Sequence, residues 1–237
     1  LGIAMGSGTP ATRAVAKLVL VDGKFSKLPR VVAEGRRIIA NMERVSALFL
    51  TKTAMSALLA VLVAIFAWRY PFLPRHLTII SSLTIGIPAF FLSLTPNYRR
   101  YRPGFLERTL HIAIPSGIVL AVTALVAQRF YAAQSLEVGS TVATLAVLMA
   151  ALYLLSVMSR PIVAYRAVIL FAMLSAGVAI VLIEPVRTFF ALTWPTPTQW
   201  LGVLVLAAVC SFLIELVFRN YSRKFGDLTR IVGDIYE

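Results

Sequence analysis

The sequence predicts an all-α membrane protein with six transmembrane helices that follow a short α/β segment. The 237-residue chain is 59% hydrophobic and only 14% charged, whereas a soluble domain is about half apolar and a quarter charged. Its apolar residues gather in six runs long enough to cross a bilayer. Its net charge of +13 reflects the excess of Lys and Arg that is typical of cytoplasmic membrane loops. This composition excludes a disordered chain and argues against a soluble domain.

Residues 1–28 read as a β-α-β segment. Residues 2–6 and residues 18–21 are short apolar runs that are typical of buried strands. Between them, Thr9 suits the cap of a helix and Pro10 suits its first position. A segment of this size cannot bury a core alone, and the chain begins with Leu rather than Met. We therefore expect a fragment of a longer protein.

A long helical pattern begins at Pro29 and predicts a cytoplasmic stalk over residues 29–44 that continues into the first span. Arg36 and Arg37 lie on this stalk, where we expect them to pair with cytoplasmic carboxylates rather than to bind a substrate. The six expected spans cover residues 45–68, 77–94, 109–128, 138–157, 163–183 and 199–218, and residues 219–237 form a tail.

The basic residues predict the orientation of the spans. Four of them, Arg69, Arg75, Arg129 and Arg187, fall on the outer side, Lys52 falls within a span, and the others fall on the side of both chain ends. This distribution predicts a multi-pass protein of the plasma membrane with both ends in the cytoplasm. It leaves no basic patch for nucleic acid, so we expect no nucleic-acid partner.

Lys52 lies well inside the first span, where a charge is costly unless it snorkels or finds a partner. Two interpretations stay open: an internal counter-charge on a transport pathway, or a side chain that snorkels to the inner interface. Thr53 and Ser56, three residues apart, share a helix face. They coordinate an ion or pack against neighbouring helices.

The second span contains Gly86 and Pro88 near its middle. Pro88 removes a backbone donor and clashes with the preceding turn. The two residues predict an interrupted helix at mid-membrane, where freed carbonyls suit an ion site. A proline kink without a site is the alternative.

The sequence contains no set of residues suited to bond-breaking chemistry, so we expect no catalytic residue in this chain. Ser-His-Asp sets, His/Cys clusters and buried carboxylate pairs are missing. Glu215, near the inner end of the last span, is expected to pair with Arg219 one turn further on. Cys210 is the only cysteine, which excludes a disulfide within the chain and predicts a buried apolar side chain.

Residues 1–9 resemble the segment that follows the Gly-Asp-Gly hinge motif in the phosphorylation domain of P-type ATPases. Residues 34–38 and Asn41 resemble the family's stalk into its fifth membrane helix. The resemblance extends to the residues themselves over 1–56 and 81–97. In the rest of the chain it concerns only the topology of the spans. It implies that residues 1–28 are the end of a HAD-like phosphorylation domain and that the six spans are membrane helices five to ten.

Residues 83–89 resemble the helix-six motif Val-Thr-Asp-Gly-Leu-Pro-Ala of calcium and sodium/potassium pumps. Ile85 replaces the key Asp of this motif, so the main carboxylate is missing. Ser81 takes the place of a coordinating Asn, and Thr53 and Ser56 take the places of Asn and Glu in helix five. The resemblance therefore implies an ion pathway of Thr53, Ser56, Ser81, Thr84, Gly86 and Pro88, with Thr53, Ser56, Ser81 and Thr84 as the metal ligands.

Lys52-Thr53 combined with the helix-six sequence looks most like an actinobacterial branch of calcium-type cation pumps, that of the mycobacterial cation transporter E. The resemblance implies that the full-length protein moves Ca²⁺ or another divalent cation through an aspartyl-phosphate cycle that uses ATP and Mg²⁺. It implies three partners: the lipid bilayer, the transported cation and the N-terminal part of the same polypeptide. This chain alone would bind no cofactor and would be inactive.

Two other functions stay open at this point. A lipid or polyamine translocase with the same ATP-driven mechanism would also suit the sequence, because lipid-flipping P-type ATPases carry a Lys in helix five and lack a full carboxylate cage. The second is a six-helix channel or scaffold subunit without ATPase activity. For a translocase, the resemblance implies that the stalk, with Arg36 and Arg37 on it, transmits domain motion to the ion pathway, and an upstream Asp-Lys-Thr-Gly-Thr motif would separate both translocases from the channel or scaffold.

Overall fold

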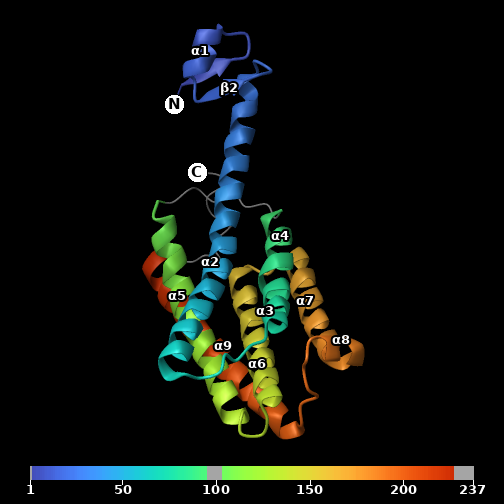
Figure 1. Ribbon diagram of the computed structural model, residues 1–237. Helices are drawn as coiled ribbons and strands as arrows, with labels where there is room; N and C mark the ends of the chain where they lie inside the picture. The colour runs from blue at the N-terminus through green and yellow to red at the C-terminus, as the bar shows by residue number, and fades with distance from the viewer. Residues whose placement is uncertain (1, 95–102, 227–237) are drawn as a thin grey trace.

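The computed structural model describes residues 2–94 and 103–226. A small α/β head stands on a long helix, and this helix runs down into a bundle of helices (Figure 1). The first residue, the loop after the second expected span and the end of the expected tail lie outside the described residues.

The head has the β-α-β order that the sequence predicts. Strands β1 (Ile3–Met5) and β2 (Leu18–Leu20) pair in parallel, with α1 (Pro10–Val15) between them. Thr9 caps α1, since its hydroxyl accepts a hydrogen bond from the backbone N–H of Thr12 at 3.3 Å. Only Ala4 and Leu20 are buried among the described head residues, so the head has almost no core of its own.

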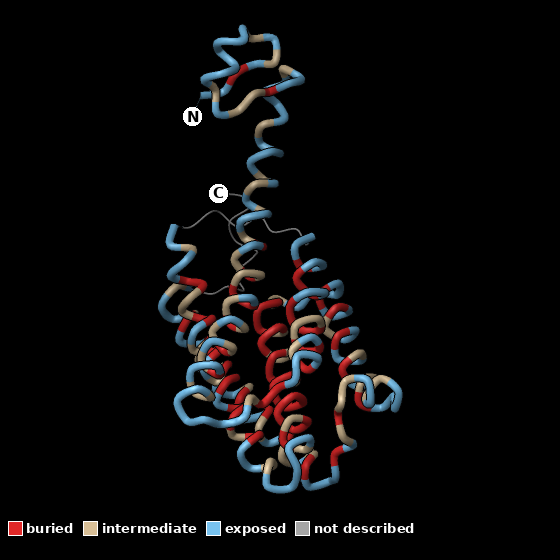
Figure 2. The backbone as a smooth tube through the Cα atoms, viewed as in Figure 1, coloured by how far each residue is buried: buried red, intermediate tan, exposed pale blue. Residues whose placement is uncertain are grey.

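Helix α2 (Leu28–Phe66) follows a 3₁₀ turn (Phe25–Lys27) and contains 39 residues without an internal proline. At 1.5 Å per residue it is about 58 Å long. Its upper third is largely exposed, and burial begins at Asn41 (Figure 2). The helix ends where Ala67 adopts a left-handed conformation. It therefore forms both the stalk and the first span, as the sequence predicts.

The second span consists of α3 (Pro74–Ser81), a π-helical turn η2 (Ser82–Gly86) and α4 (Ile87–Ser93). The expected interruption is present, but it is a widened turn and not an unwound segment. Pro88 cannot donate a hydrogen bond to the preceding turn. The backbone N–H of Ile87 bonds to the carbonyl of Ser82, five residues back, which keeps the segment helical through a π-bulge.

Helix α6 (Leu136–Met158) lies at the centre of the bundle and is the most buried span. Its neighbours are α5 (Phe105–Tyr131), α9 (Pro197–Phe225), α3 and α7 (Ala164–Leu182). A short helix α8 (Glu184–Phe189), which was not predicted, follows α7. The described residues thus contain six helices that are long and apolar enough to cross a membrane, which confirms the predicted fold class.

Candidate ion pathway

A cavity of about 20 Å³ lies inside the bundle where α2 passes the π-helical turn. A space of this size holds about one water molecule. Its polar lining consists of Thr51, Lys52 and Thr84. Aliphatic and methionine side chains from α2, α3, η2, α5 and α6 complete the wall: Leu48, Met55, Ile80, Ile85, Leu120, Val147, Ala151 and Leu154. The structure therefore places Lys52 and Thr84 on the wall of the same cavity.

The two threonines of the cavity present their oxygens as acceptors. The Thr51 hydroxyl donates to the carbonyl of Ala47 at 2.7 Å, and the Thr84 hydroxyl donates to the carbonyl of Ile80 at 2.6 Å. Each hydroxyl proton is therefore used within its own helix, while the lone pairs of the oxygen remain free to bind a donor or a cation. Sequence reasoning missed Thr51, although its position next to Lys52 was a usable signal.

Lys52 is partly exposed and directly follows the buried Thr51 in α2. Among the residues that the structure describes, no carboxylate lies within 4 Å of its ammonium group. Among the described residues, Lys52 thus lines the cavity together with two threonines and apolar side chains and forms no ion pair. This arrangement suits an internal cation that responds to the occupancy of the cavity.

The other predicted ligands lie outside this cavity. Thr53 is exposed and its hydroxyl donates to the carbonyl of Phe49 at 3.0 Å. Ser81 is partly buried and donates to the carbonyl of Leu77 at 2.5 Å. Ser56 is partly buried. Their role as ligands stays a prediction.

Gly86, at the end of the π-helical turn, and Pro88, at the start of α4, differ in burial. Gly86 is exposed on the surface of the bundle, whereas Pro88 is buried. Within the described part of the chain, no group of three or more His, Cys, Asp or Glu side chains gathers as metal ligands. At this level the described residues offer hydroxyl and carbonyl oxygens, which suit hard cations.

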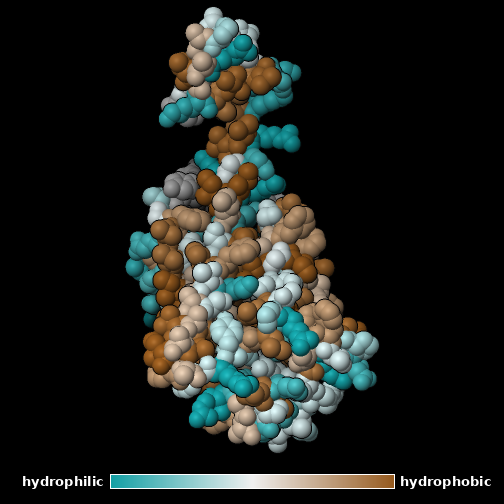
Figure 3. Space-filling model, viewed as in Figure 1, coloured by the Kyte–Doolittle hydropathy of each residue, from teal (hydrophilic) through white to brown (hydrophobic). Residues whose placement is uncertain are grey.

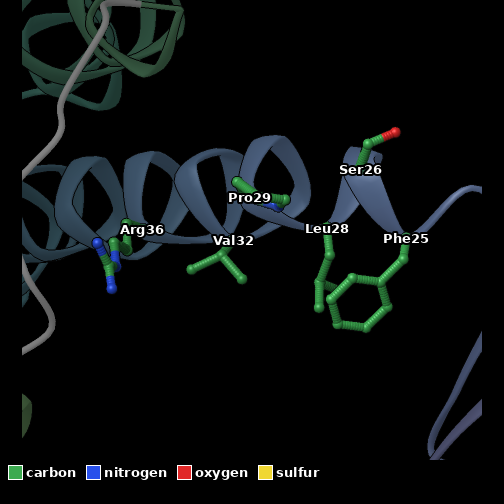
Figure 4. Close-up of a pocket in the computed structure, with 6 residues that line it drawn as sticks. All are labelled: Phe25, Ser26, Leu28, Pro29, Val32 and Arg36. Atoms are coloured by element: carbon green, nitrogen blue, oxygen red, sulfur yellow. The ribbon is translucent and has the colours of Figure 1, made fainter.

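The two stalk arginines have different surroundings. Arg37 pairs with Glu34 at 2.7 Å, one turn away on the same helix, which agrees with the expected carboxylate pairing. Arg36 is exposed and lines a hollow of about 450 Å³ beneath the head, with Phe25, Leu28 and Val32 as apolar walls (Figure 4).

An ion-pair network at the end of the bundle nearest the head contains the expected pair of Glu215 and Arg219 and adds a closer partner, Arg160. Arg160 binds Glu215 through two contacts of 3.0 and 3.2 Å, and the Tyr153 hydroxyl donates to the same carboxylate at 2.8 Å. The expected partner Arg219 lies further away, at 3.7 Å. The Glu215 carboxylate raises the pKa of the Arg160 guanidinium above its ordinary value, so Arg160 remains charged.

At the opposite end of the bundle, the start of α3 binds the end of α8. The Arg75 guanidinium donates to the carbonyl of Phe189 at 2.8 Å, and Nε2 of His76 lies 2.9 Å from the carbonyl of Phe190. His76 is fully buried, and its Nδ1 accepts from the backbone N–H of Leu73 at 3.3 Å. In the neutral ring Nε2 therefore carries the proton and donates a hydrogen bond to the Phe190 carbonyl. These contacts attach the second span, which contains the π-helical turn, to the end of α8.

Comparison with known proteins gives three informative relatives, although no family model matches the chain. The chain is 40% identical over 98% of its length to "Calcium-transporting ATPase CtpE" of Mycobacterium bovis, and 41% identical over 98% to the protein of that name in Mycolicibacterium smegmatis. It is 34% identical over 56% of its length to "Probable cation-transporting ATPase exp7" of Streptococcus pneumoniae. The chain spans 31% of the length of the first two relatives and 18% of the third.

Proposed function

The chain belongs to the cation-transporting P-type ATPases, and on this premise we propose that it is the C-terminal membrane part of an ATP-driven pump for Ca²⁺ or another divalent cation. The observation that carries the proposal is the 40% identity to a calcium-transporting ATPase over 98% of the chain. The six candidate spans and the cavity with Lys52 and Thr84 support it.

In this proposal, different parts of the full-length protein carry out ATP hydrolysis, coupling and ion transport. The N-terminal part binds ATP and Mg²⁺ and carries the phosphorylated Asp, while residues 1–28 complete the phosphorylation domain. Residues 29–44, with Arg36 and Arg37, couple that domain to the spans at 45–218. Helix α2 supports this role because it runs without a break from the head to the cavity. Both chain ends lie in the cytoplasm and the protein lies in the plasma membrane.

Lys52 is the internal counter-charge of the proposed pathway. A cation that enters beside Thr84 repels the ammonium group, so the bound ion and Lys52 compete for the same region. When the ion leaves, Lys52 supplies a positive charge in its place. Thr53, Ser56, Ser81, Gly86 and Pro88 form the remainder of the pathway, with ligands from the N-terminal part of the pump.

The test measures ATPase activity of the full-length protein in lipid vesicles, stimulated by Ca²⁺, Mn²⁺ or Mg²⁺. We expect Ca²⁺ stimulation, and we expect Lys52→Ala to shift the half-maximal Ca²⁺ concentration by roughly tenfold or more. Thr84→Val removes one cavity oxygen and should weaken the Ca²⁺ response. Thr78→Val is the matched control, because Thr78 makes the same type of hydroxyl-to-carbonyl bond on α3 but is exposed.

A lipid translocase is the second candidate, and it is favoured by the charge of Lys52, which forms no ion pair with the described residues. A site with an ammonium group and few carboxylates would attract an anionic headgroup more readily than a cation. Stimulation of the ATPase by an anionic lipid, without any response to the three metal ions, would replace the cation pump by this function. An unchanged metal response in Lys52→Ala would refute the counter-charge role.

A further inference from the structure

The inner end of the second span is bound by side chains of two other helices. The last four carbonyls of a helix lack partners within that helix, and α4 ends at Ser93. Nδ2 of Asn41 on α2 donates to the carbonyl of Ser93 at 3.0 Å. The Tyr165 hydroxyl on α7 donates to the carbonyl of Phe91 at 3.2 Å. The end of α4 is therefore attached to α7 and to α2, the helix on which the head stands (Figure 1).

Asn41 lies at the level where α2 enters the bundle, and polar contacts gather there. Only 3% of Asn41 is exposed, and a buried amide needs hydrogen-bond partners. Close by on α2, Glu43 binds Arg108 of α5 at 2.7 Å. Arg44 donates to the carbonyl of Arg160 at 3.3 Å. About one turn of α2 thus makes polar contacts with the second span, the third span and the loop after α6.

The helices joined by Asn41 meet again at the candidate cavity, where Lys52 and Thr84 line the wall. Lys52 lies roughly 16 Å beyond Asn41 along α2, and Thr84 lies roughly 13 Å before Ser93 along the second span. The two helices therefore run in opposite directions, and α2 packs against both α4 and the π-helical turn. The bond between Asn41 and Ser93 thus joins the two helices at one end of the stretch that has the cavity at its other end.

Hydrogen bonds between helices have particular weight in this bundle. Hydrophobic side chains gather along both of its flanks (Figure 3), and its core is apolar as well. Apolar packing therefore limits only weakly how far one span slides along its neighbour, whereas hydrogen bonds between the spans fix their relative positions. A hydrogen bond of this type keeps its donor and acceptor within about 0.5 Å of one separation.

The start of the second span is attached too. Arg75 and His76 bind it to the carbonyls of Phe189 and Phe190 at the end of α8. The π-helical turn lies between this attached start and the attached end of α4. A π-helical turn contains one residue more than an α-helical turn, so it can take up a change in the distance between the two ends of the span.

We propose that Asn41 is a positioning residue of the ion pathway, an inference that rests on the proposed pump function. Its hydrogen bond holds the end of α4 at one level along α2 and thereby sets the position of Thr84 relative to Lys52. Without the bond, α4 slides along α2 and the π-helical turn changes its geometry. A displacement of α2 that begins at the head also reaches α4 through this bond.

The test compares variants of the full-length protein in lipid vesicles. Asn41→Leu removes the donor and keeps a side chain of similar size, and Asn41→Ala removes the donor in case leucine does not fit. Asn41→Gln keeps the amide on a side chain that is one methylene longer. Tyr165→Phe is the matched control, because it removes a bond to the same end of α4 from α7, which contributes no described residue to the cavity wall.

The first readout is the Ca²⁺ concentration that gives half-maximal stimulation of the ATPase. We expect Asn41→Leu and Asn41→Ala to shift it by roughly fivefold, the factor that corresponds to one net hydrogen bond. Asn41→Gln should shift it less, and Tyr165→Phe should leave it unchanged. The proposal is overturned if Tyr165→Phe shifts the concentration as much as Asn41→Leu does, or if Asn41→Gln gives no rescue.

The second readout is deuterium exchange of the backbone amides of residues 82–87, which needs neither ATP nor a transported ion. We expect exchange in Asn41→Leu to be roughly fivefold faster than in the unmodified protein and in Tyr165→Phe, because the π-helical turn opens more often. Unchanged exchange would overturn the positioning role. If the unmodified protein shows no Ca²⁺ stimulation, the pump proposal fails, and the exchange rates alone decide whether Asn41 positions the turn.

Discussion

Replacing Gly117 by alanine should separate α5 from α2 at the level of the candidate cavity. A Cβ atom at Gly117 would lie 2.7 Å from Cβ of Ala54, 2.8 Å from the carbonyl oxygen of Thr51 and 2.9 Å from the backbone nitrogen of Met55. Two of these atoms belong to the backbone and the third is a Cβ, so no side-chain rotation relieves the overlap. The two helices must move apart by roughly 0.5–1 Å to restore normal contact distances.

Overpacking of this kind costs about 1–3 kcal/mol of stability. The matched control is Gly177→Ala, since its nearest neighbour would be Cδ2 of Leu148 at an ordinary 3.6 Å. Both glycines lie inside helices, so the gain in helix propensity is similar in the two variants. The difference between them therefore isolates the steric effect. Because Thr51 lines the cavity, Gly117→Ala should also alter the metal response that we propose for the full-length protein.

The assay follows thermal unfolding of the full-length protein in detergent, together with the metal-stimulated ATPase activity that we propose for it. We expect Gly117→Ala to unfold at a lower temperature than both the unmodified protein and Gly177→Ala. If Gly117→Ala matches Gly177→Ala in both unfolding temperature and metal response, then α2 and α5 do not pack as closely as the structure describes.

Two further perturbations test the ends of the bundle. Glu215→Gln should lower the free energy of unfolding by about 1–2 kcal/mol, because it removes the anion bound by the partly buried Arg160; Arg219→Gln should cost less than about 0.5 kcal/mol, since that side chain is 69% exposed. If chemical denaturation gives the same loss of unfolding free energy for Glu215→Gln and Arg219→Gln, then Arg160 is not the main partner of Glu215. His76→Leu should cost about 1–2 kcal/mol through the loss of the bond to the Phe190 carbonyl, and His76→Gln should restore part of it. If His76→Gln is no more stable than His76→Leu in thermal unfolding, the hydrogen bond contributes little.

The local pattern of the sequence predicted the head and the six spans because both depend on runs of neighbouring residues. Thr9 and Pro10 identify the start of α1 by their own chemistry. Gly86 and Pro88 identify the position of the irregular turn, but not its form. Loss of one backbone donor is compatible with an unwound segment or with a π-turn, and packing against the neighbouring helices decides between them.

The partners of the polar residues depend on contacts between distant segments. Glu215 and Arg160 are 55 residues apart, so a rule for neighbouring turns finds only Arg219. A uniformly apolar span also conceals which side faces the protein, because lipid and protein interiors favour the same side chains. Thr51 is buried and Thr53 is exposed, although the two differ by only two positions.

The close crossing at Gly117 gives α2 the mechanics of a lever. From the level of Ala54 to the top of the helix at Leu28 the distance is about 39 Å, and to its lower end at Phe66 it is about 18 Å. If α2 pivots at this crossing, its upper arm is roughly twice as long as its lower arm. A sideways displacement of the head then moves the lower end of α2 about half as far, with about twice the force. Lys52 lies only about 3 Å along the axis from this crossing. Rocking of α2 would thus move the two rims of the membrane domain far more than the cavity between them.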